Sequence, residues 1–129
     1  MNNLVQYYIV DAALGLRKGK IGAQCAHGAL LADRVYQSVQ TWAEANPEDS
    51  KSVALANQYA DWFNGLMTKI VLKGDIGSMN WAQTTYGHMA ATVVDAGFTE
   101  IPAGTTTVVV LPIMDKSEAP DWVRGLKLL

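Results

Sequence analysis

The sequence LVQYYIV at positions 4–10 is a run of aromatic and β-branched residues of strand length, a composition that favours β-structure. Small and glycine-bearing residues follow at positions 12–15, and apolar residues then recur at helical intervals over positions 20–45. Asn46 and Pro47 end that pattern, because a proline disfavours the helical conformation in the residue before it. This part of the chain therefore predicts a strand, a loop and a long helix, in that order.

The rest of the chain continues the alternation of helices and strands. The patterns predict helices over 50–65 and 78–91, and strands over 68–73, 92–95 and 105–111. A last short helix is expected within 115–125, capped by Ser117 and with Pro120 in its first turn. Strands separated by helices indicate a layered α/β domain with a partly parallel sheet of about four strands.

The bulk composition is that of an ordinary globular protein. With 129 residues, of which 50% are hydrophobic, the chain is expected to form a single domain over residues 1–129. Cys25 is the only cysteine, so no intramolecular disulfide can form and a cytoplasmic location is expected. Neither a secretory signal nor an apolar run near the roughly 20 residues of a membrane span is readable, so no membrane association is expected.

The formal net charge of −2 argues against a protein coated in basic surface, which is typical of nucleic-acid binders. Arg17, Lys18 and Lys20 nevertheless place three cations within four residues, where a loop enters a predicted helix. The backbone N–H groups and the positive end of a helix favour an anion there. Ile21 follows Lys20, so the spacing of a phosphate-binding Walker loop is absent, as is a dinucleotide-binding fingerprint. Solvated lysines on a turn are the alternative.

Polar residues inside the same predicted helix extend this candidate site. Gln24 and His27 are three residues apart and so share a helix face near Lys20, although they could instead bond the loop that covers them. His88 has no metal-ligand spacing to His27 or Cys25, so no zinc site is expected. Cys25 is expected to act as a small buried apolar residue rather than as a nucleophile.

A second constellation follows the strand predicted over 92–95. Asp95 stands at the strand end, before a glycine turn and several hydroxyl residues, and strand ends of open α/β sheets are where sites form. An aspartate beside threonines and a lysine can orient a water molecule and stabilise the charge that develops when an ester or amide carbonyl is attacked. An Asx turn, with the threonines chosen for their β propensity, is the structural alternative.

Taken together, the segments KGKIGAQCAHGA (18–29) and DAGxTxIPxGTxT (95–107) resemble the type 2 peptidyl-tRNA hydrolases, and the ending GLKLL (125–129) is similar to the C-terminus of that family. The likeness covers nearly the whole chain in order. It implies a three-layer α/β/α domain with a mixed four-stranded sheet flanked by helices on both faces, often in a dimer. The implied activity is hydrolysis of the ester between the peptide and the 3′ ribose of tRNA, without a metal or organic cofactor.

The resemblance also assigns residues position by position. Lys20, Asp95, Thr99 and Thr107 match the catalytic positions, and Arg17, Lys18, Gln24 and His27 are expected to bind the substrate. Lys20 would bind a phosphate of the CCA end or the developing oxyanion, and Asp95 would hold Lys20 or an attacking water, with the threonines fixing that geometry.

This sequence departs from the family pattern beside the expected catalytic acid. Phe98 stands where the family usually has a basic residue, and Glu100 stands where it usually has glutamine. Losing a cation and adding an anion weakens the attraction for phosphate. The alternatives to a peptidyl-tRNA hydrolase are therefore a non-catalytic member of the same fold that binds RNA or protein, and a hydrolase of another small ester or amide.

Overall fold

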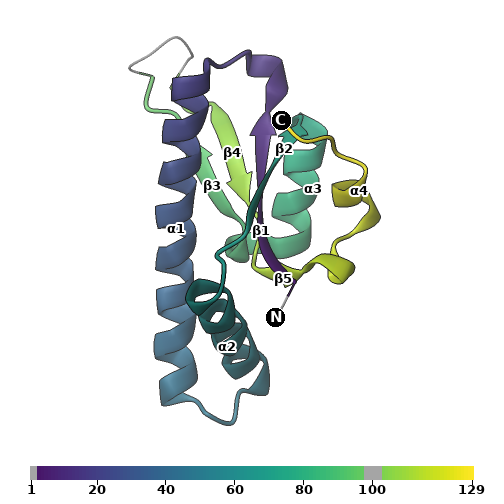
Figure 1. Cartoon of the computed structure of the whole chain (residues 1–129). Coiled ribbons are helices and arrows are strands. Elements are labelled where there is room, and N and C mark those ends of the chain that lie inside the picture. Colours follow the sequence, from purple (N-terminus) through teal and green to yellow (C-terminus); the bar gives the residue numbers. More distant parts are fainter. Residues whose placement is uncertain (1–2, 98–102) are drawn as a thin grey trace.

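The computed structural model describes residues 3–97 and 103–129, and it contains a mixed β-sheet between helices (Figure 1). The strands are β1 (Leu4–Asp11), β2 (Lys69–Gly74), β3 (Ala91–Val94), β4 (Thr106–Val110) and the short β5 (Met114–Asp115). The helices are α1 (Lys18–Ala45), α2 (Ser50–Asn64), α3 (Ile76–Tyr86) and α4 (Asp121–Arg124). Short 3-10 helices are η1 (Ala12–Leu14), η2 (Gly87–Met89) and η3 (Lys116–Glu118).

The main path of the sheet has the strand order β2-β1-β4-β3. β1 pairs in parallel with β2 and antiparallel with β4, and β4 pairs antiparallel with β3, while β5 pairs with the start of β1. α1 covers one face of the sheet, and α3 and α4 cover the other (Figure 1). The predicted α/β/α arrangement with a mixed sheet of four main strands is confirmed for the described residues.

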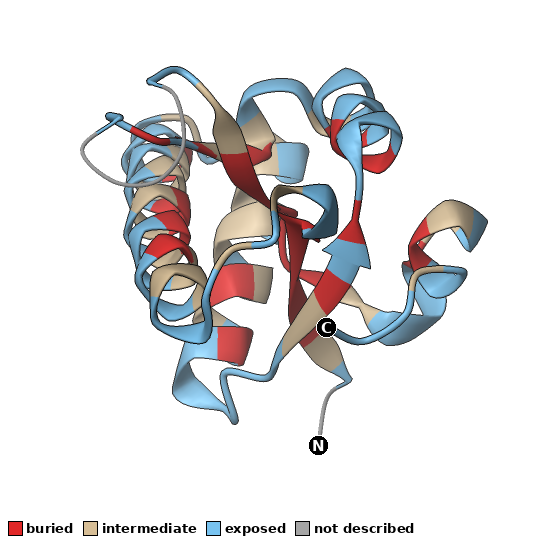
Figure 2. Ribbon diagram, turned by 90° about the horizontal axis from the view of Figure 1, so that it is seen from above, coloured by how far each residue is buried: buried red, intermediate tan, exposed pale blue. Residues whose placement is uncertain are grey.

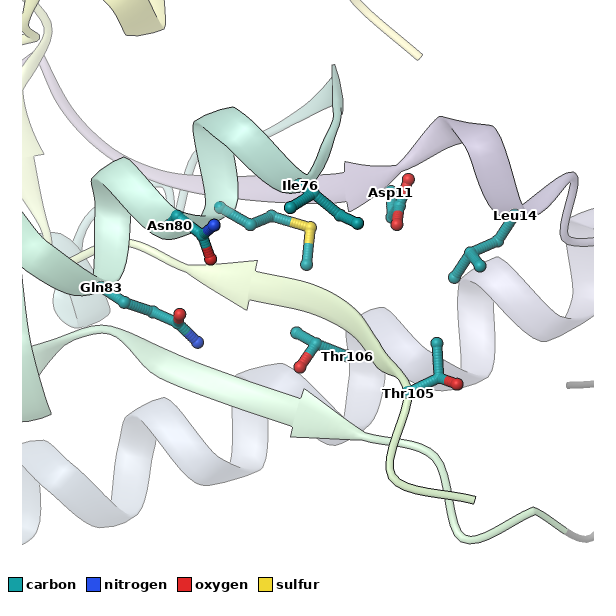
Figure 3. Close-up of a pocket in the computed structure, with 8 residues that line it drawn as sticks. Asp11, Leu14, Ile76, Asn80, Gln83, Thr105 and Thr106 are labelled. Carbon is teal, nitrogen blue, oxygen red and sulfur yellow. The ribbon is translucent and has the colours of Figure 1, made fainter. Parts of the chain in front are cut away.

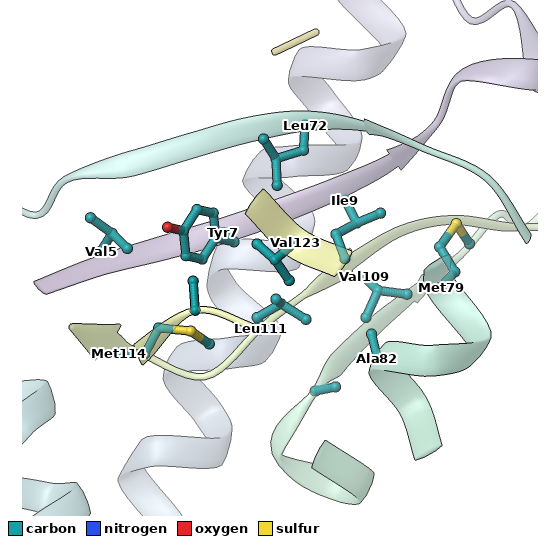
Figure 4. Packing of buried hydrophobic residues seen from close by; sticks show 12 residues of the cluster. Val5, Tyr7, Ile9, Leu72, Met79, Ala82, Val109, Leu111, Met114 and Val123 are labelled. Atoms are coloured by element: carbon teal, nitrogen blue, oxygen red, sulfur yellow. The ribbon is translucent and has the colours of Figure 1, made fainter. Parts of the chain in front are cut away.

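The interior strand β1 supplies side chains to both faces of the sheet, because successive side chains of a strand point to opposite sides. Tyr7 and Ile9 belong to the apolar cluster under α3 and α4 (Figure 4), whereas Tyr8 and Val10 belong to the cluster under α1. All four are buried, and Figure 2 shows the buried residues concentrated along the sheet and on the helix faces turned toward it. These two apolar clusters hold α1 against one face of the sheet and α3 and α4 against the other.

The C-terminal residues protect the outer edge of the sheet. Lys73 donates its backbone N–H to the carbonyl of Lys127 at 2.8 Å, and Leu129 donates to the carbonyl of Val71 at 3.1 Å. Residues 127–129 thus lie along β2, which is an edge strand whose unpaired groups would otherwise be exposed. This pairing gives the ending GLKLL a place in the sheet through its backbone, while the side chains of Leu128 and Leu129 are exposed.

α1 approaches the sheet closely at Gly28, which is buried. A Cβ atom added to Gly28 would lie 2.7 Å from Cγ2 of Val110 and 3.2 Å from Cγ2 of Val93. Lys20 and Gln24 precede Gly28 by eight and four residues and so lie on the same helix face. The missing side chain at position 28 therefore sets how near these two polar residues come to the sheet.

Two predicted helices differ from the structure. The helix predicted over 78–91 begins earlier, at Ile76, because Asp75 and Ser78 form a capping box, in which the Asp75 side chain accepts from the Ser78 N–H at 2.8 Å. It ends earlier, at Tyr86, because Gly87 takes a φ of 55°. Residues 89–94 are an apolar run that suits a helix or a strand equally, and Ala91 belongs to β3.

The single helix predicted within 115–125 is wrong, because this segment is divided into η3 and α4. Asp115, rather than Ser117, is the cap of η3, and its side chain accepts from the Ser117 N–H at 2.9 Å. Ala119 is extended, as residues before proline usually are. Pro120 therefore separates the two short helices and serves as the N-cap of α4.

Within the described residues, no helix combines the length and the apolar character that crossing a membrane requires.

We expect Gly28→Ala to lower the free energy of unfolding by roughly 1 kcal/mol. Overpacking against two stiff valines costs about 1–3 kcal/mol, and the better helix propensity of alanine returns up to about 1 kcal/mol. Gly22→Ala is the matched control in the same helix, because no described residue outside the nearby turns of α1 lies within 4 Å of a Cβ at that position. It should raise stability by roughly 0.5–1 kcal/mol. Urea unfolding that showed both variants equally stabilised would contradict the close approach of α1.

Candidate active site

The first turn of α1 meets the end of β3 at one end of the sheet. Lys20 lies in that turn, and its Nζ is 2.5 Å from Oδ2 of Asp95, the residue that follows β3. Gln24, one helical turn further along α1, donates through Nε2 to the same carboxylate oxygen at 2.9 Å. The structure thus brings together three of the residues that the sequence analysis selected, from segments more than 70 positions apart.

Hydrogen bonds within the turn after β3 fix both the side chain and the backbone of Asp95. Its Oδ1 accepts from the backbone N–H of Gly97 at 2.6 Å. Its own N–H donates to the Thr105 carbonyl, and its carbonyl accepts from the Gly104 N–H, both at 2.9 Å. Gly97 and Gly104 have φ angles of 82° and 85°, which residues other than glycine rarely adopt. The Asp-x-Gly turn therefore does more than reverse the chain, because it supplies a hydrogen-bond donor to the acid.

The sheet has an irregularity at the end of β3, next to Asp95. Val93 pairs with Val108, but Val94 pairs with Thr106, so Thr107 is an extra residue in β4 and forms a β-bulge. Thr107 is completely buried. Among the described residues, its hydroxyl contacts the Val93 carbonyl oxygen, at 3.5 Å, rather than Lys20 or Asp95. The structure thus places Thr107 in the strand that supports the site.

The donors around Asp95 hold the pKa of its carboxyl group below the ordinary value. The hydrogen bond from Lys20 has the largest effect, and the Gly97 N–H, the positive charge of Lys20 and the Gln24 amide act in the same direction. Burial opposes them by penalising the charged form. Asp95 is therefore a carboxylate at neutral pH, with both oxygens engaged by donors.

The two members of the ion pair differ in how far solvent reaches them. The Lys20 side chain is 18% exposed, whereas the Asp95 side chain is 2% exposed. Solvent therefore reaches the Lys20 side chain more than the Asp95 side chain. The arrangement can therefore present a fixed cation to a negatively charged or strongly polarised oxygen.

Two further cations stand where α1 begins. Arg17 is the N-cap residue and Lys18 the first helical residue, and both are exposed. The Arg17 side chain makes no capping bond to the helix. The first N–H groups of an α-helix lack acceptors within the helix, and cations beside them favour an anion, as in helix termini that bind anions.

The remaining predicted site residues are placed differently. His27 is exposed on α1, whereas Gln24 is buried against Asp95, so the expected common polar face is divided between solvent and core. Thr99 lies outside the described residues, as do the neighbouring departures Phe98 and Glu100. Their roles stay predictions.

Among the described residues, no group of three His, Cys, Asp or Glu side chains is placed to hold a metal ion. Cys25 is half-buried at the edge of the apolar cluster under α1, and burial raises the pKa of its thiol. A raised pKa keeps the sulfur protonated and poorly nucleophilic. Cys25 therefore packs as a small apolar residue.

Sequence reasoning left the partner of Gln24 open and considered the Asx turn at Asp95, which uses the Gly97 N–H, only as an alternative to a site. The i, i+4 spacing of Lys20 and Gln24 was the signal for a shared helix face. The Asp95-x-Gly97 pattern was the signal for an Asx turn. Neither pattern could show that both groups converge on one carboxylate, because that depends on how α1 crosses the sheet.

The chain is similar to known proteins of one family. A family model described as Peptidyl-tRNA hydrolase PTH2 matches residues 4–129. Peptidyl-tRNA hydrolase 2 of Saccharomyces cerevisiae is 34% identical over 124 residues, which cover 93% of this chain and 55% of the yeast protein. The probable peptidyl-tRNA hydrolase 2 of Dictyostelium discoideum is 29% identical over 127 residues, covering 95% of this chain and 53% of that protein.

A relative of more similar length is the peptidyl-tRNA hydrolase of Thermococcus sibiricus, which is 31% identical over 107 residues, or 79% of this chain and 77% of that protein. The chain spans about half the length of the yeast and Dictyostelium relatives. Since the family model matches the chain from residue 4 to residue 129, the chain belongs to the Peptidyl-tRNA hydrolase PTH2 family.

Proposed function

We propose that this chain hydrolyses the ester bond that joins a peptide to the 3′ ribose of tRNA, releasing tRNA and free peptide. The observation that carries the proposal is the Lys20–Asp95 pair, steadied by Gln24, at the cationic start of α1. Family membership supports the choice of substrate, since the relatives that match this chain are named peptidyl-tRNA hydrolases.

The chemistry that the site would support is attack of water on the ester carbonyl. The water oxygen adds to the carbonyl carbon, the bond from that carbon to the 3′ oxygen breaks, and a proton from the water ends on the 3′ oxygen. Negative charge develops on the carbonyl oxygen during the attack. The Lys20 ammonium would stabilise this charge, because a fixed donor in a partly buried site loses little energy to reorganisation.

Asp95 would act through Lys20 rather than on the substrate. Its carboxylate is almost fully buried, and its oxygens already accept from Lys20, Gln24 and the Gly97 N–H. It is therefore proposed to aim the ammonium group and to keep it charged. Thr99 is proposed to orient the water on the strength of its match to the family motif, and Thr107 to support Asp95 through the bulge in β4.

The substrate is an RNA, whereas the whole chain has a formal net charge of −2. Arg17 and Lys18 at the start of α1 would therefore bind phosphates locally, with His27 further along the exposed side of the helix. Few phosphate contacts imply weak binding with a shallow dependence on salt concentration.

A cytoplasmic location, a homodimer and a single domain over residues 1–129 stay predictions, and sedimentation analysis would test the homodimer.

Lys20→Ala should lower kcat for a peptidyl-tRNA by roughly 100- to 1,000-fold, the usual effect of removing one oxyanion donor. The loss should fall on kcat, because the interaction forms in the transition state. A loss that falls only on KM would instead assign Lys20 to a phosphate of the CCA end.

Lys51→Ala is the matched control, because Lys51 is an exposed lysine on α2 and the change removes the same charge. It should leave kcat unchanged, and circular dichroism should show both variants folded. Wild-type rates in Lys20→Ala would contradict the proposed role of Lys20. No cleavage of peptidyl-tRNA by the wild-type chain would leave the alternatives, a binding protein without activity or a hydrolase of another small ester or amide.

The proposed role of Asp95 also fixes how stability should depend on pH. A folded pKa below the unfolded value means that the folded state resists protonation, so the carboxylate stabilises the fold above the unfolded pKa of about 3.9. This contribution should disappear as the pH falls below about 4 and passes through the lower folded value.

Denaturant unfolding of the wild type and of Asp95→Asn between pH 3 and pH 7 measures this effect. The wild type should be the more stable protein at neutral pH, and the difference should shrink on acidification. In a Lys20→Met background, the acid dependence should be weaker, because the largest cause of the shift is gone. A difference that stays constant or grows toward pH 3 would show that Asp95 is not held ionised by these donors.

A further inference from the structure

A cavity of about 310 Å³ lies at the same end of the sheet as the Lys20–Asp95 pair, but on the α3 side. Figure 3 shows Asn80 and Gln83 projecting from α3 toward Thr106 of β4, with Asp11 and Leu14 at the other end of the cavity. These residues come from β1, η1, α3 and β4. Nothing in the proposed hydrolysis uses this cavity.

The cavity is joined to the proposed catalytic pair by the hairpin of β3 and β4. Thr105 lines the cavity, and its carbonyl oxygen accepts the backbone N–H of Asp95 at 2.9 Å. Asp95 points from this hairpin toward α1, while Thr105 and Thr106 line the cavity toward α3. A ligand that reached past the Asp95–Thr105 contact would therefore touch both places.

The lining favours an uncharged group with flat apolar faces and hydrogen-bonding edges. Leu14 and Met79 supply apolar surface, and a methionine sulfur packs well against aromatic rings. Asn80 and Gln83 supply amides, and Asp11, which is 5% exposed, supplies a carboxyl group whose Oδ1 also accepts from the Ala13 N–H at 3.1 Å. Among the described residues that line the cavity there is no lysine, arginine or histidine, and an acid there disfavours phosphate.

We propose that this cavity binds the adenine base of the 3′-terminal nucleotide of the substrate, an inference that rests on the proposed function. Adenine is uncharged and presents an amino donor beside a ring-nitrogen acceptor, the pair that an asparagine or glutamine amide matches with its carbonyl and its NH₂ group. Gln83 donates through Nε2 to Thr92 at 3.3 Å, which uses one of the two N–H donors of its amide and leaves the other donor and the carbonyl oxygen for a base.

The size of the cavity favours the adenine base, rather than the peptide part of the substrate, as its occupant. Ligand pockets run from about 300 to 1,000 Å³, so a cavity of about 310 Å³ suits one heterocycle rather than a length of chain. The base would occupy the neutral α3 side and the phosphates the cationic start of α1. The ester, which is attached to the ribose between them, would then lie near the Lys20 ammonium.

The test compares binding of two short RNAs that end in CCA or in CC-inosine, each carrying an acetylated amino acid through a 3′ amide that water does not cleave readily. Inosine replaces the adenine amino group with a carbonyl oxygen and leaves the charge unchanged. The wild type should bind the adenosine form about tenfold more tightly, as for other paired contacts to a base edge. The double variant Asn80→Ala/Gln83→Ala should bind the two forms equally.

Thr84→Ala is the matched control, because Thr84 is exposed on the same helix and does not line the cavity. It should keep the tenfold preference. Equal binding of both RNAs by the wild type, no binding of either, or a preference that survives in the double variant would each overturn the adenine site. Cleavage of the corresponding 3′ esters, measured separately, tests the proposed hydrolysis, so the failure of one proposal can be told from the failure of the other.

Discussion

The contact on which the site depends is the ion pair between Lys20 of α1 and Asp95 after β3. Burying a carboxylate is costly unless charge and hydrogen bonds compensate for the lost water. Here Lys20, Gln24 and the Gly97 N–H supply that compensation. The pair ties the long helix to the end of the sheet, and Lys20 is its more exposed member.

Several features of the fold serve this one contact. Gly28 lets α1 lie close enough to the sheet for Lys20 and Gln24 to reach the end of β3. The bulge at Thr107 and the turns at Gly97 and Gly104 fix where β3 ends and how Asp95 leaves it. Interactions that must be ready before the substrate arrives need this rigid support, because an ammonium that has to reorient stabilises a developing charge less well.

The fold was largely predictable because its elements have strong local patterns. The apolar run of β1, the helical periodicity of α1 and the stop at Asn46 and Pro47 are all local signals. The errors fell where local signals conflict. The apolar run at 89–94 suits a helix or a strand, and Pro120 interrupts a segment whose caps otherwise favour one helix.

The site was predictable only in part. Lys20 and Asp95 were selected from their motifs, but their contact depends on tertiary packing across 75 positions. The cavity on the α3 side was not predicted, because Asp11, Asn80 and Thr106 come from different elements and form no pattern along the chain. The acidic net charge is compatible with a local cationic site, since Arg17, Lys18 and Lys20 are grouped at one helix start.

The central claim is that Lys20 and Asp95 act as one unit, and a double-mutant cycle on kcat for a peptidyl-tRNA tests it most directly. The variants are Lys20→Ala, Asp95→Ala and the combination of both. Residues that work as a unit show strongly non-additive effects. The account predicts that the double variant is about as slow as the slower single variant. Losses that multiply in the double variant would show that the two residues act independently and would contradict it.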